Sequence, residues 1–132
     1  MLLVDSVTQL VTEDAGAVAV TGSHGGRSVV RYALAQPMML VVFNDAGVGK
    51  DGAGIAALAL MQRRGRAAAT VSHTSARIGD ACDAWRHGVL SHVNPAAAAL
   101  GLAPGLSLGA ALRAALKRQG PAEAGPSSPR ER

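Results

Sequence analysis

Side chains able to move protons or bind anions gather in four short polar stretches, each following an apolar run. The stretches are GSHGG (22–26), NDAGVGKDG (44–52), SHTSARIGD (72–80) and SHVN (91–94). Three of the four histidines lie in them. Imidazole and carboxylate groups suit general acid–base catalysis near neutral pH. Such chemistry requires a fold that brings the stretches together.

The apolar runs predict a fold that would do so. They indicate strands at 17–21, 38–43, 67–71 and 88–93. Residues with helical spacing follow the first three, at 27–36, 51–65 and 79–88. We therefore predict an α/β fold: a small three-layer Rossmann-like domain with a short, mainly parallel sheet and helices on both faces. Since parallel strands end at one edge of a sheet, the polar stretches are expected to meet there.

The two ends of the chain have weaker patterns. Residues 1–12 fit either a strand or a strand that runs into a helical turn from Asp5. Two further helices are predicted at 95–101 and 107–119. We expect residues 1–118 to form a single α/β domain. The charged segment 119–132, rich in Pro, Gly and Ser, is predicted to be a disordered tail.

The first polar stretch, GSHGG, has three glycines that would let a ligand approach the backbone. A helix starting near Arg27 would favour an anion beside it. We predict that Gly25 and Gly26 bind this anion and that Ser23 contacts the ligand. His24 is the predicted general acid or base. The alternative is a tight turn in which Ser23 or His24 only satisfies backbone N–H groups.

Asn44 and Asp45 stand at the end of the second predicted strand. Asp45 is predicted to orient His24 or to accept its proton, and Asn44 to bind the ligand. The alternative for this pair is an Asx turn, in which the side chains bond to the local backbone.

The last two stretches add further candidates for ligand binding. Ser75 and Arg77 would clamp a carboxylate or phosphate. The alternative is that Arg77 only pairs with an aspartate of the next helix. His73 or His92 is predicted to polarise an oxygen of the ligand. Asn94, which ends the fourth stretch, is predicted to bind the ligand as well.

Cofactor motifs are incomplete in this chain. Gly47, Gly49 and Gly52 fit G-x-G-x-x-G, but His73 stands where an acidic ribose partner is expected. Lys50 follows a glycine as in a phosphate-binding P-loop, yet the first glycine and the Ser/Thr of that motif are missing. The histidines lack the local spacing of a metal site. We predict neither a nucleotide cofactor nor a metal.

Composition narrows the classes of partner. The 132 residues have a formal charge of +4 but only 2% aromatic residues, and no basic stripe is interleaved with aromatics, which disfavours nucleic acid. No apolar run reaches membrane-spanning length and no signal peptide is recognisable, so we expect a cytoplasmic protein without a membrane partner. Cys82 is the single cysteine and is expected to be structural. Ala- and Leu-rich helices between 96 and 117 favour a homo-oligomer.

These features favour an enzyme that performs acid–base chemistry as a lyase, isomerase or hydrolase. Its substrate would be a small anionic metabolite that carries a carboxylate or phosphate. The alternative is a non-catalytic ligand-binding or assembly subunit of a larger enzyme complex.

Overall fold

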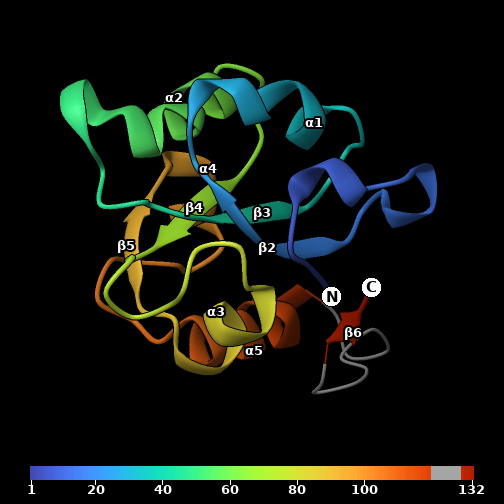
Figure 1. Ribbon diagram of the computed structural model, residues 1–132. Helices are drawn as coiled ribbons and strands as arrows, with labels where there is room; N and C mark the ends of the chain where they lie inside the picture. Colours follow the sequence, from blue (N-terminus) through green and yellow to red (C-terminus); the bar gives the residue numbers. More distant parts are fainter. Residues whose placement is uncertain (120–128) are drawn as a thin grey trace.

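A computed structural model describes residues 1–119 and 129–132 of the chain. In that part of the chain, a six-stranded sheet has the order β5-β4-β3-β2-β1-β6 (Figure 1). The strands are β1 (Leu2–Val4), β2 (Val18–His24), β3 (Leu40–Asn44), β4 (Ala68–Val71), β5 (Leu90–Val93) and β6 (Arg130–Glu131). The helices are α1 (Val30–Leu34), α2 (Ala56–Gln62), α3 (Ala81–His87), α4 (Pro95–Ala99) and α5 (Leu108–Gln119). All neighbouring strands are parallel except β4 and β5, so the predicted α/β fold is confirmed.

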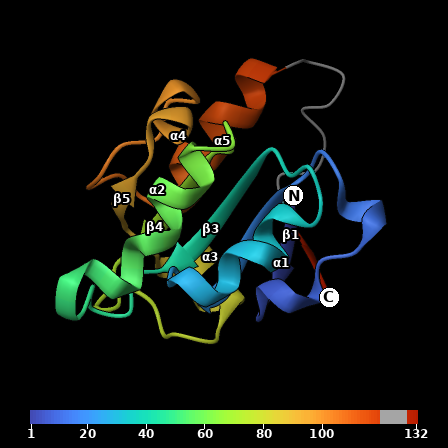
Figure 2. The ribbon, with the colours of Figure 1, turned by 90° about the horizontal axis from the view of Figure 1, so that it is seen from above.

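Helices cover both faces of the sheet because alternate strand residues point to opposite sides. In β3, Val41 and Phe43 pack in one apolar cluster with α1 and α2. Leu40 and Val42 pack in the other cluster, with α3 and α5. Figure 1 shows these two helical layers on either side of the sheet, and Figure 2, seen from above, shows α1 and α2 lying over the strands. Fully buried alanines in β4, Ala68 and Ala69, let the layers approach closely.

Both ends of the chain join the sheet. At the N-terminus, β1 leads into a 3₁₀ turn at Val7–Gln9, which is the second of the two predicted alternatives for residues 1–12. At the other end, Gln119 completes α5, and β6 pairs in parallel with β1. The segment 120–128, most of the predicted disordered tail, lies outside the described residues.

The prediction that the last strand of the four runs parallel to the others is wrong: β5 is antiparallel to β4. After β4 the chain crosses to α3, which packs against β1 and β2 rather than running back along β4. Only Gly88 and Val89 join α3 to β5. Leu90, at the start of β5, therefore pairs with Val71 at the end of β4. A parallel strand would need a connection that returns to the other edge of the sheet.

Among the described helices, none combines the length and the apolar character that crossing a bilayer requires. The longest, α5, packs Leu108 and Leu112 into the core and carries Lys117 and Arg118 in its last turn. Those cations suit the negative end of the helix dipole. The helix is therefore an amphipathic cover for the sheet.

Gly22 in β2 lies against the loop that precedes α3, and this close approach yields a test of the fold. A Cβ at residue 22 would lie 2.4 Å from the backbone N of Asp80, and the Gly79 N–H donates to the Gly22 carbonyl at 2.8 Å. We expect Gly22→Ala to lower the free energy of unfolding by about 1–3 kcal/mol, because backbone must move to make room.

The matched control is Gly109→Ala in α5. Its Cβ would lie 3.4 Å from the Trp85 carbonyl oxygen, an ordinary contact, and alanine favours a helix. Urea denaturation should therefore leave this variant as stable as the wild type or slightly more so. Equal midpoints for Gly22→Ala and the wild type would contradict the close packing at β2.

Candidate functional site

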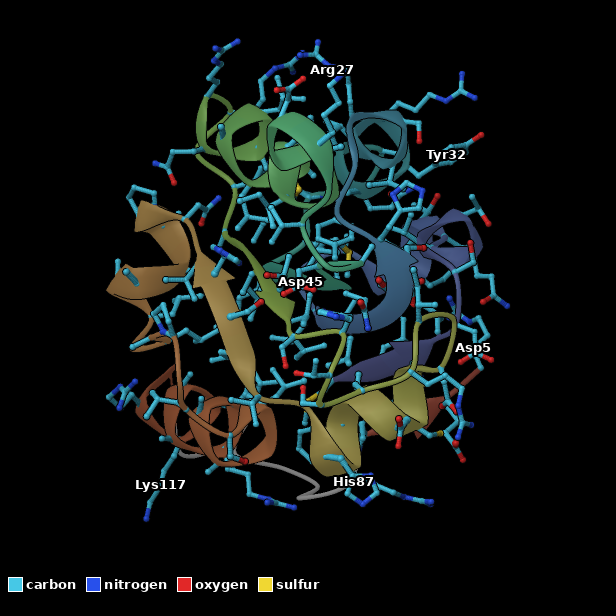
Figure 3. All side chains as sticks on the ribbon, turned by 60° about the vertical axis from the view of Figure 1, so that its left-hand side comes forward. Asp5, Arg27, Tyr32, Asp45, His87 and Lys117 are labelled. Carbon is cyan, nitrogen blue, oxygen red and sulfur yellow. The ribbon has the colours of Figure 1, made fainter. Side chains whose placement is uncertain are left out.

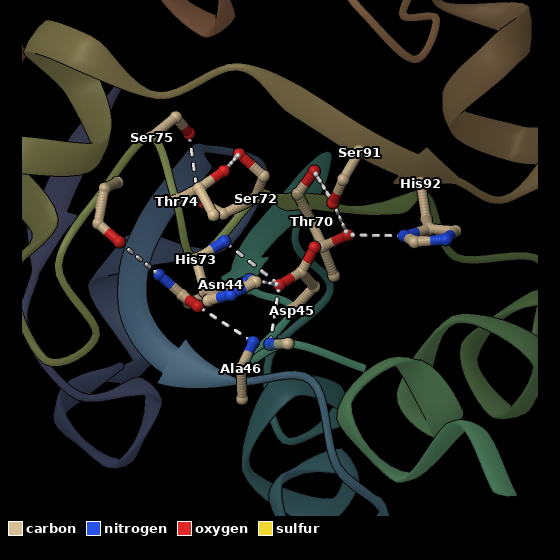
Figure 4. A network of polar contacts seen from close by, with 12 residues as sticks. Asn44, Asp45, Ala46, Thr70, Ser72, His73, Thr74, Ser75, Ser91 and His92 are labelled. Atoms are coloured by element: carbon tan, nitrogen blue, oxygen red, sulfur yellow. Dashed lines mark hydrogen bonds and ion pairs between the residues drawn. The ribbon is translucent and has the colours of Figure 1, made fainter. Parts of the chain in front are cut away.

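The carboxyl ends of β2, β3 and β4 lie side by side, as expected, and bring three of the polar stretches to one edge of the sheet. His24 is paired with Asn44 in the register between β2 and β3. The Asp45 N–H donates to the Val71 carbonyl at 2.9 Å, which ties the end of β3 to the end of β4. Figure 4 shows the polar side chains that meet here. His24, Asp45 and His73 thus come from neighbouring strand ends.

Asn44 is buried and fixes the loops. Its Oδ1 accepts from the Ala46 N–H at 2.8 Å, and its Nδ2 donates to the Ala76 carbonyl at 3.0 Å. Both ends of the amide are therefore engaged by backbone. The bond to Ala46 is the Asx turn that the sequence analysis gave as the alternative. The bond to Ala76 links the end of β3 to the loop after β4.

Asp45 pairs with His73, not with His24. Its Oδ1 accepts from the Gly47 N–H at 2.8 Å and from the His73 N–H at 3.0 Å, and lies 3.3 Å from His73 Nδ1. The predicted pairing with His24 is wrong because His24 Nδ1 instead accepts from the Gly26 N–H of its own loop, at 3.0 Å. Asp45 is 4% exposed, whereas the His73 side chain is largely open to solvent.

Asp45 is ionised at neutral pH. Burial by itself raises the pKa of the carboxyl, but hydrogen bonds from the Gly47 N–H, the Ser91 hydroxyl and the His73 N–H and side chain outweigh it and hold the pKa below its usual value. A carboxylate that accepts several hydrogen bonds is stabilised in its charged form. The site therefore contains a buried, oriented negative charge.

The contacts of the two imidazole rings favour particular tautomers. His73 Nδ1 lies 3.3 Å from the Asp45 carboxylate, which only accepts, so this contact favours a proton on Nδ1. His24 Nδ1 accepts from Gly26, so its proton lies on Nε2, which can donate. The contacts thus favour opposite tautomers in the two histidines.

Hydroxyl groups extend the polar cluster towards β5. Thr70 Oγ1 lies 2.8 Å from Ser91 Oγ and 3.5 Å from His92 Nδ1 (Figure 4). Ser91 also contributes to the lowered pKa of the Asp45 carboxyl. Sequence reasoning missed Thr70 because it is buried within a run of small apolar residues. Its hydroxyl, the only polar group in that run, was the available signal.

Beside this cluster lies an open hollow of about 320 Å³. It is bordered by the loop after β2, by the start of the following 3₁₀ turn and by the loop after β3: His24, Gly26, Arg27, Ser28, Ala46, Val48, Gly49, Ala53 and Gly54. A Cβ at Gly47 would lie 3.6 Å from the His73 ring. The loop at 46–48 therefore separates the hollow from the Asp45–His73 pair. Sequence reasoning missed Arg27 and Ser28 as lining residues, although their place at a predicted helix start was a signal.

The loop after β3 has an unusual backbone. Ala46 and Val48 have φ of 52° and 67°, in the left-handed region that β-branched residues rarely adopt. The loop packs on the end of β3, where a Cβ on Gly54 would lie 1.9 Å from the Asp45 carbonyl oxygen. Strained backbone of this kind clusters at functional sites.

Several predicted residues do not line the hollow. Ser23 Oγ accepts from the Val7 N–H at 2.9 Å. Ser75 Oγ donates to the Ser72 carbonyl and accepts from the Val89 N–H, both at 2.9 Å. Arg77 is exposed and lies 3.6 Å from Asp80, which is the ion-pair alternative of the sequence. The structure thus does not bring the predicted clamp of Ser75 and Arg77 to His24.

Asn94 lies beside Ala68, at the amino end of β4, so the structure does not bring it to His24 and Asp45. Its Oδ1 accepts from the Ala68 and Ala97 N–H groups, each at 3.0 Å. Its Nδ2 donates to the Leu58 carbonyl at 3.1 Å and to the Arg66 carbonyl at 2.9 Å. The cause is the direction of β5, which carries its last residues away from the carboxyl ends of the other strands.

His87 lies far from this edge. Figure 3 shows it on α3, with Asp45 between it and Arg27. Its Nδ1 lies 2.9 Å from Asp83 Oδ1 on the same helix. Within residues 1–119 and 129–132, no three His, Cys, Asp or Glu side chains are arranged to hold a metal ion.

The lowered pKa of Asp45 predicts how Asp45→Asn changes stability with pH. Because the pKa is lower in the folded chain than in the unfolded chain, the carboxylate stabilises the fold above the ordinary value of about 4 and loses this effect as the pH falls. Asp45→Asn should therefore be less stable than the wild type at pH 7, and the difference should shrink below about pH 4. Urea denaturation across this range measures it, with the exposed Asp51→Asn as control. A difference that does not change with pH would contradict the assignment.

Three parallel strands thus place a buried carboxylate, two histidines of opposite tautomer and a hollow at one edge of the sheet. Comparisons of the chain with protein-family models, with curated proteins and with solved structures each find no match.

Proposed function

We propose that the protein is an enzyme that transfers protons on a small metabolite bearing a carboxylate or phosphate, as a lyase, isomerase or hydrolase. The observation that carries this proposal is the buried, ionised Asp45 held against Nδ1 of the exposed His73. A carboxylate in this position keeps the imidazole in one tautomer and stabilises the imidazolium that forms when Nε2 takes a proton. His73 is therefore the proposed general base.

His24 is the proposed general acid. Its Nε2–H is free to donate while Nδ1 is held by Gly26, and the ring borders the hollow. A pair of groups with opposite proton roles is what an isomerisation or elimination needs. The substrate would lie in the hollow and extend past Gly47 towards His73.

Arg27 and Ser28 are the proposed anion-binding residues. Both line the hollow beside His24. A guanidinium and a hydroxyl provide charge-assisted and neutral donors for a carboxylate or phosphate. In this proposal they replace Ser75 and Arg77, which the sequence predicted as the residues that clamp the anion.

The alternative is a ligand-binding or assembly subunit without catalytic activity. Homo-oligomer formation through the helices between 96 and 117, and a cytoplasmic location, also stay predictions. The native mass in solution would test the first of these.

Binding of anions is tested with ¹³C-labelled histidine. Inorganic phosphate, acetate or succinate should shift the His24 signal in a saturable way and leave the His87 signal unchanged, at constant ionic strength. Arg27→Ala should weaken binding about tenfold, since a hydrogen bond from a charged group is lost. Arg31→Ala is the matched control, because Arg31 stacks on the Tyr32 ring, 4.8 Å from its centre. Shifts of equal size at His24 and His87 would contradict a specific site.

Proton transfer is tested by deuterium incorporation. Small carboxylates and phosphates are incubated with the protein in D₂O, and exchange at carbon is followed by mass spectrometry. His73→Gln should lower the rate at least about 100-fold, the usual contribution of a general base, whereas His87→Gln should not. Near-normal turnover in both His73→Gln and His24→Gln would end the proposal. Saturable binding with neither exchange nor turnover would favour the non-catalytic alternative.

A further inference from the structure

The outer edge of β1 is covered by a segment of the chain itself. Residues 130–132 add a parallel strand in which Leu2 and Leu3 pair with Arg130 and Glu131. The Arg130 N–H donates to the Met1 carbonyl at 3.1 Å, and the Arg132 N–H donates to the Leu3 carbonyl at 3.0 Å. Figure 1 shows β6 at this edge, beside the N-terminus. Strand pairing of this type provides affinity through the backbone, while pockets for side chains provide specificity.

A single side chain provides that specificity here. The Arg132 guanidinium donates to both carboxylate oxygens of Asp14, at 2.5 and 2.8 Å, and to the Gln9 carbonyl at 3.0 Å. Asp14 is only 1% exposed. A planar guanidinium satisfies a carboxylate with two parallel hydrogen bonds, which an ammonium cannot do. The contact therefore recognises arginine.

Asp14 is oriented without help from the C-terminal segment. Its Oδ2 accepts from the Val11 N–H at 2.8 Å, and its own N–H donates to the Val11 carbonyl at 2.9 Å. Gln9 ends a separate 3₁₀ turn that Ser6 caps. The side-chain hydrogen bonds that orient these two segments thus come from within residues 6–14. A preformed site of this kind loses little entropy when it binds.

The segment in this site makes few other contacts. Both residues of β6 are exposed, and the Glu131 carboxylate accepts a hydrogen bond from the Cys82 thiol. The strand is two residues long, so the Arg132–Asp14 pair is its main anchor. If Arg132 leaves, the Asp14 carboxylate loses two charge-assisted hydrogen bonds until another guanidinium replaces them.

We propose that the β1 edge and the turn Gln9–Asp14 form a docking site for an extended peptide segment that carries an arginine, and that residues 130–132 occupy it as a displaceable internal ligand. The backbone pairing with β1 and the guanidinium contacts with Asp14 and Gln9 define which peptide can bind. The parallel ladder with β1 sets its direction, and Asp14 selects a guanidinium one residue after the position paired with Leu3. A segment supplied from outside the chain competes with residues 130–132 for the same groups.

The proposal is tested with full-length Arg132→Ala and a fluorescent, end-blocked peptide of sequence SSPRER, which copies residues 127–132. Anisotropy should show saturable binding to this variant. The wild type should bind at least about tenfold more weakly, because its own Arg132 occupies the site most of the time. Arg130→Ala is the matched control: it keeps the Arg132–Asp14 pair and should bind as weakly as the wild type.

Specificity is tested on the peptide, where misfolding cannot intervene. Replacement of the final arginine of the peptide by citrulline should abolish binding to Arg132→Ala, because the charge and two donors are lost. Adding Asp14→Asn to Arg132→Ala should have the same effect in a chain whose circular dichroism is unchanged. Absence of saturable binding to Arg132→Ala, or equal binding of the arginine and citrulline peptides, would overturn the proposal.

Discussion

The buried carboxylate of Asp45 is the constraint around which the site is built. An ionised carboxyl group with only 4% exposure is stable only when hydrogen bonds compensate for lost water. Gly47 and His73 provide these bonds from two loops that are 26 residues apart in the chain, so one charge holds both loops against the end of β3. The same rule holds across the described residues, where every buried side-chain nitrogen or oxygen has a hydrogen-bond partner. Hydrogen bonds therefore fix the positions of the polar side chains at the carboxyl ends of β3 and β4.

The geometry of the hollow follows from this constraint. To donate to Asp45, the backbone after β3 must turn immediately, and Ala46 and Val48 adopt left-handed conformations in the course of that turn. Gly54 then lies against the Asp45 carbonyl, where a side chain would clash. The strain in the loop is offset by the hydrogen bonds that it makes possible. His24 and His73 end up on opposite sides of the same short loop, each with one nitrogen engaged and one free.

The two outer sides of the sheet, at β5 and at β1, are stabilised by different contacts. At one edge, β5 is antiparallel to β4 and is joined to it through Thr70 and Ser91, which extends the polar cluster. At the other edge, β1 is covered by β6 and by the Arg132–Asp14 pair. An uncovered strand edge is a template for pairing with other chains. The second edge is thus both protected and, in our proposal, able to recognise a peptide.

Local pattern in the sequence determined the strands β2, β3 and β4 and the placement of His24, Asp45 and His73 at their ends, because burial and periodicity are properties of neighbouring residues. It also limited Asn44 and Arg77 to two alternatives each. Only the tertiary structure decided that Asp45 pairs with His73, that β5 is antiparallel and removes Asn94 from the site, and that Arg132 reaches Asp14. Each of these depends on how distant segments pack: α3 crosses to β1 and β2, and a buried charge takes the partner that the folded backbone brings within reach. The spacing of residues along the chain does not predict these distances in the folded protein.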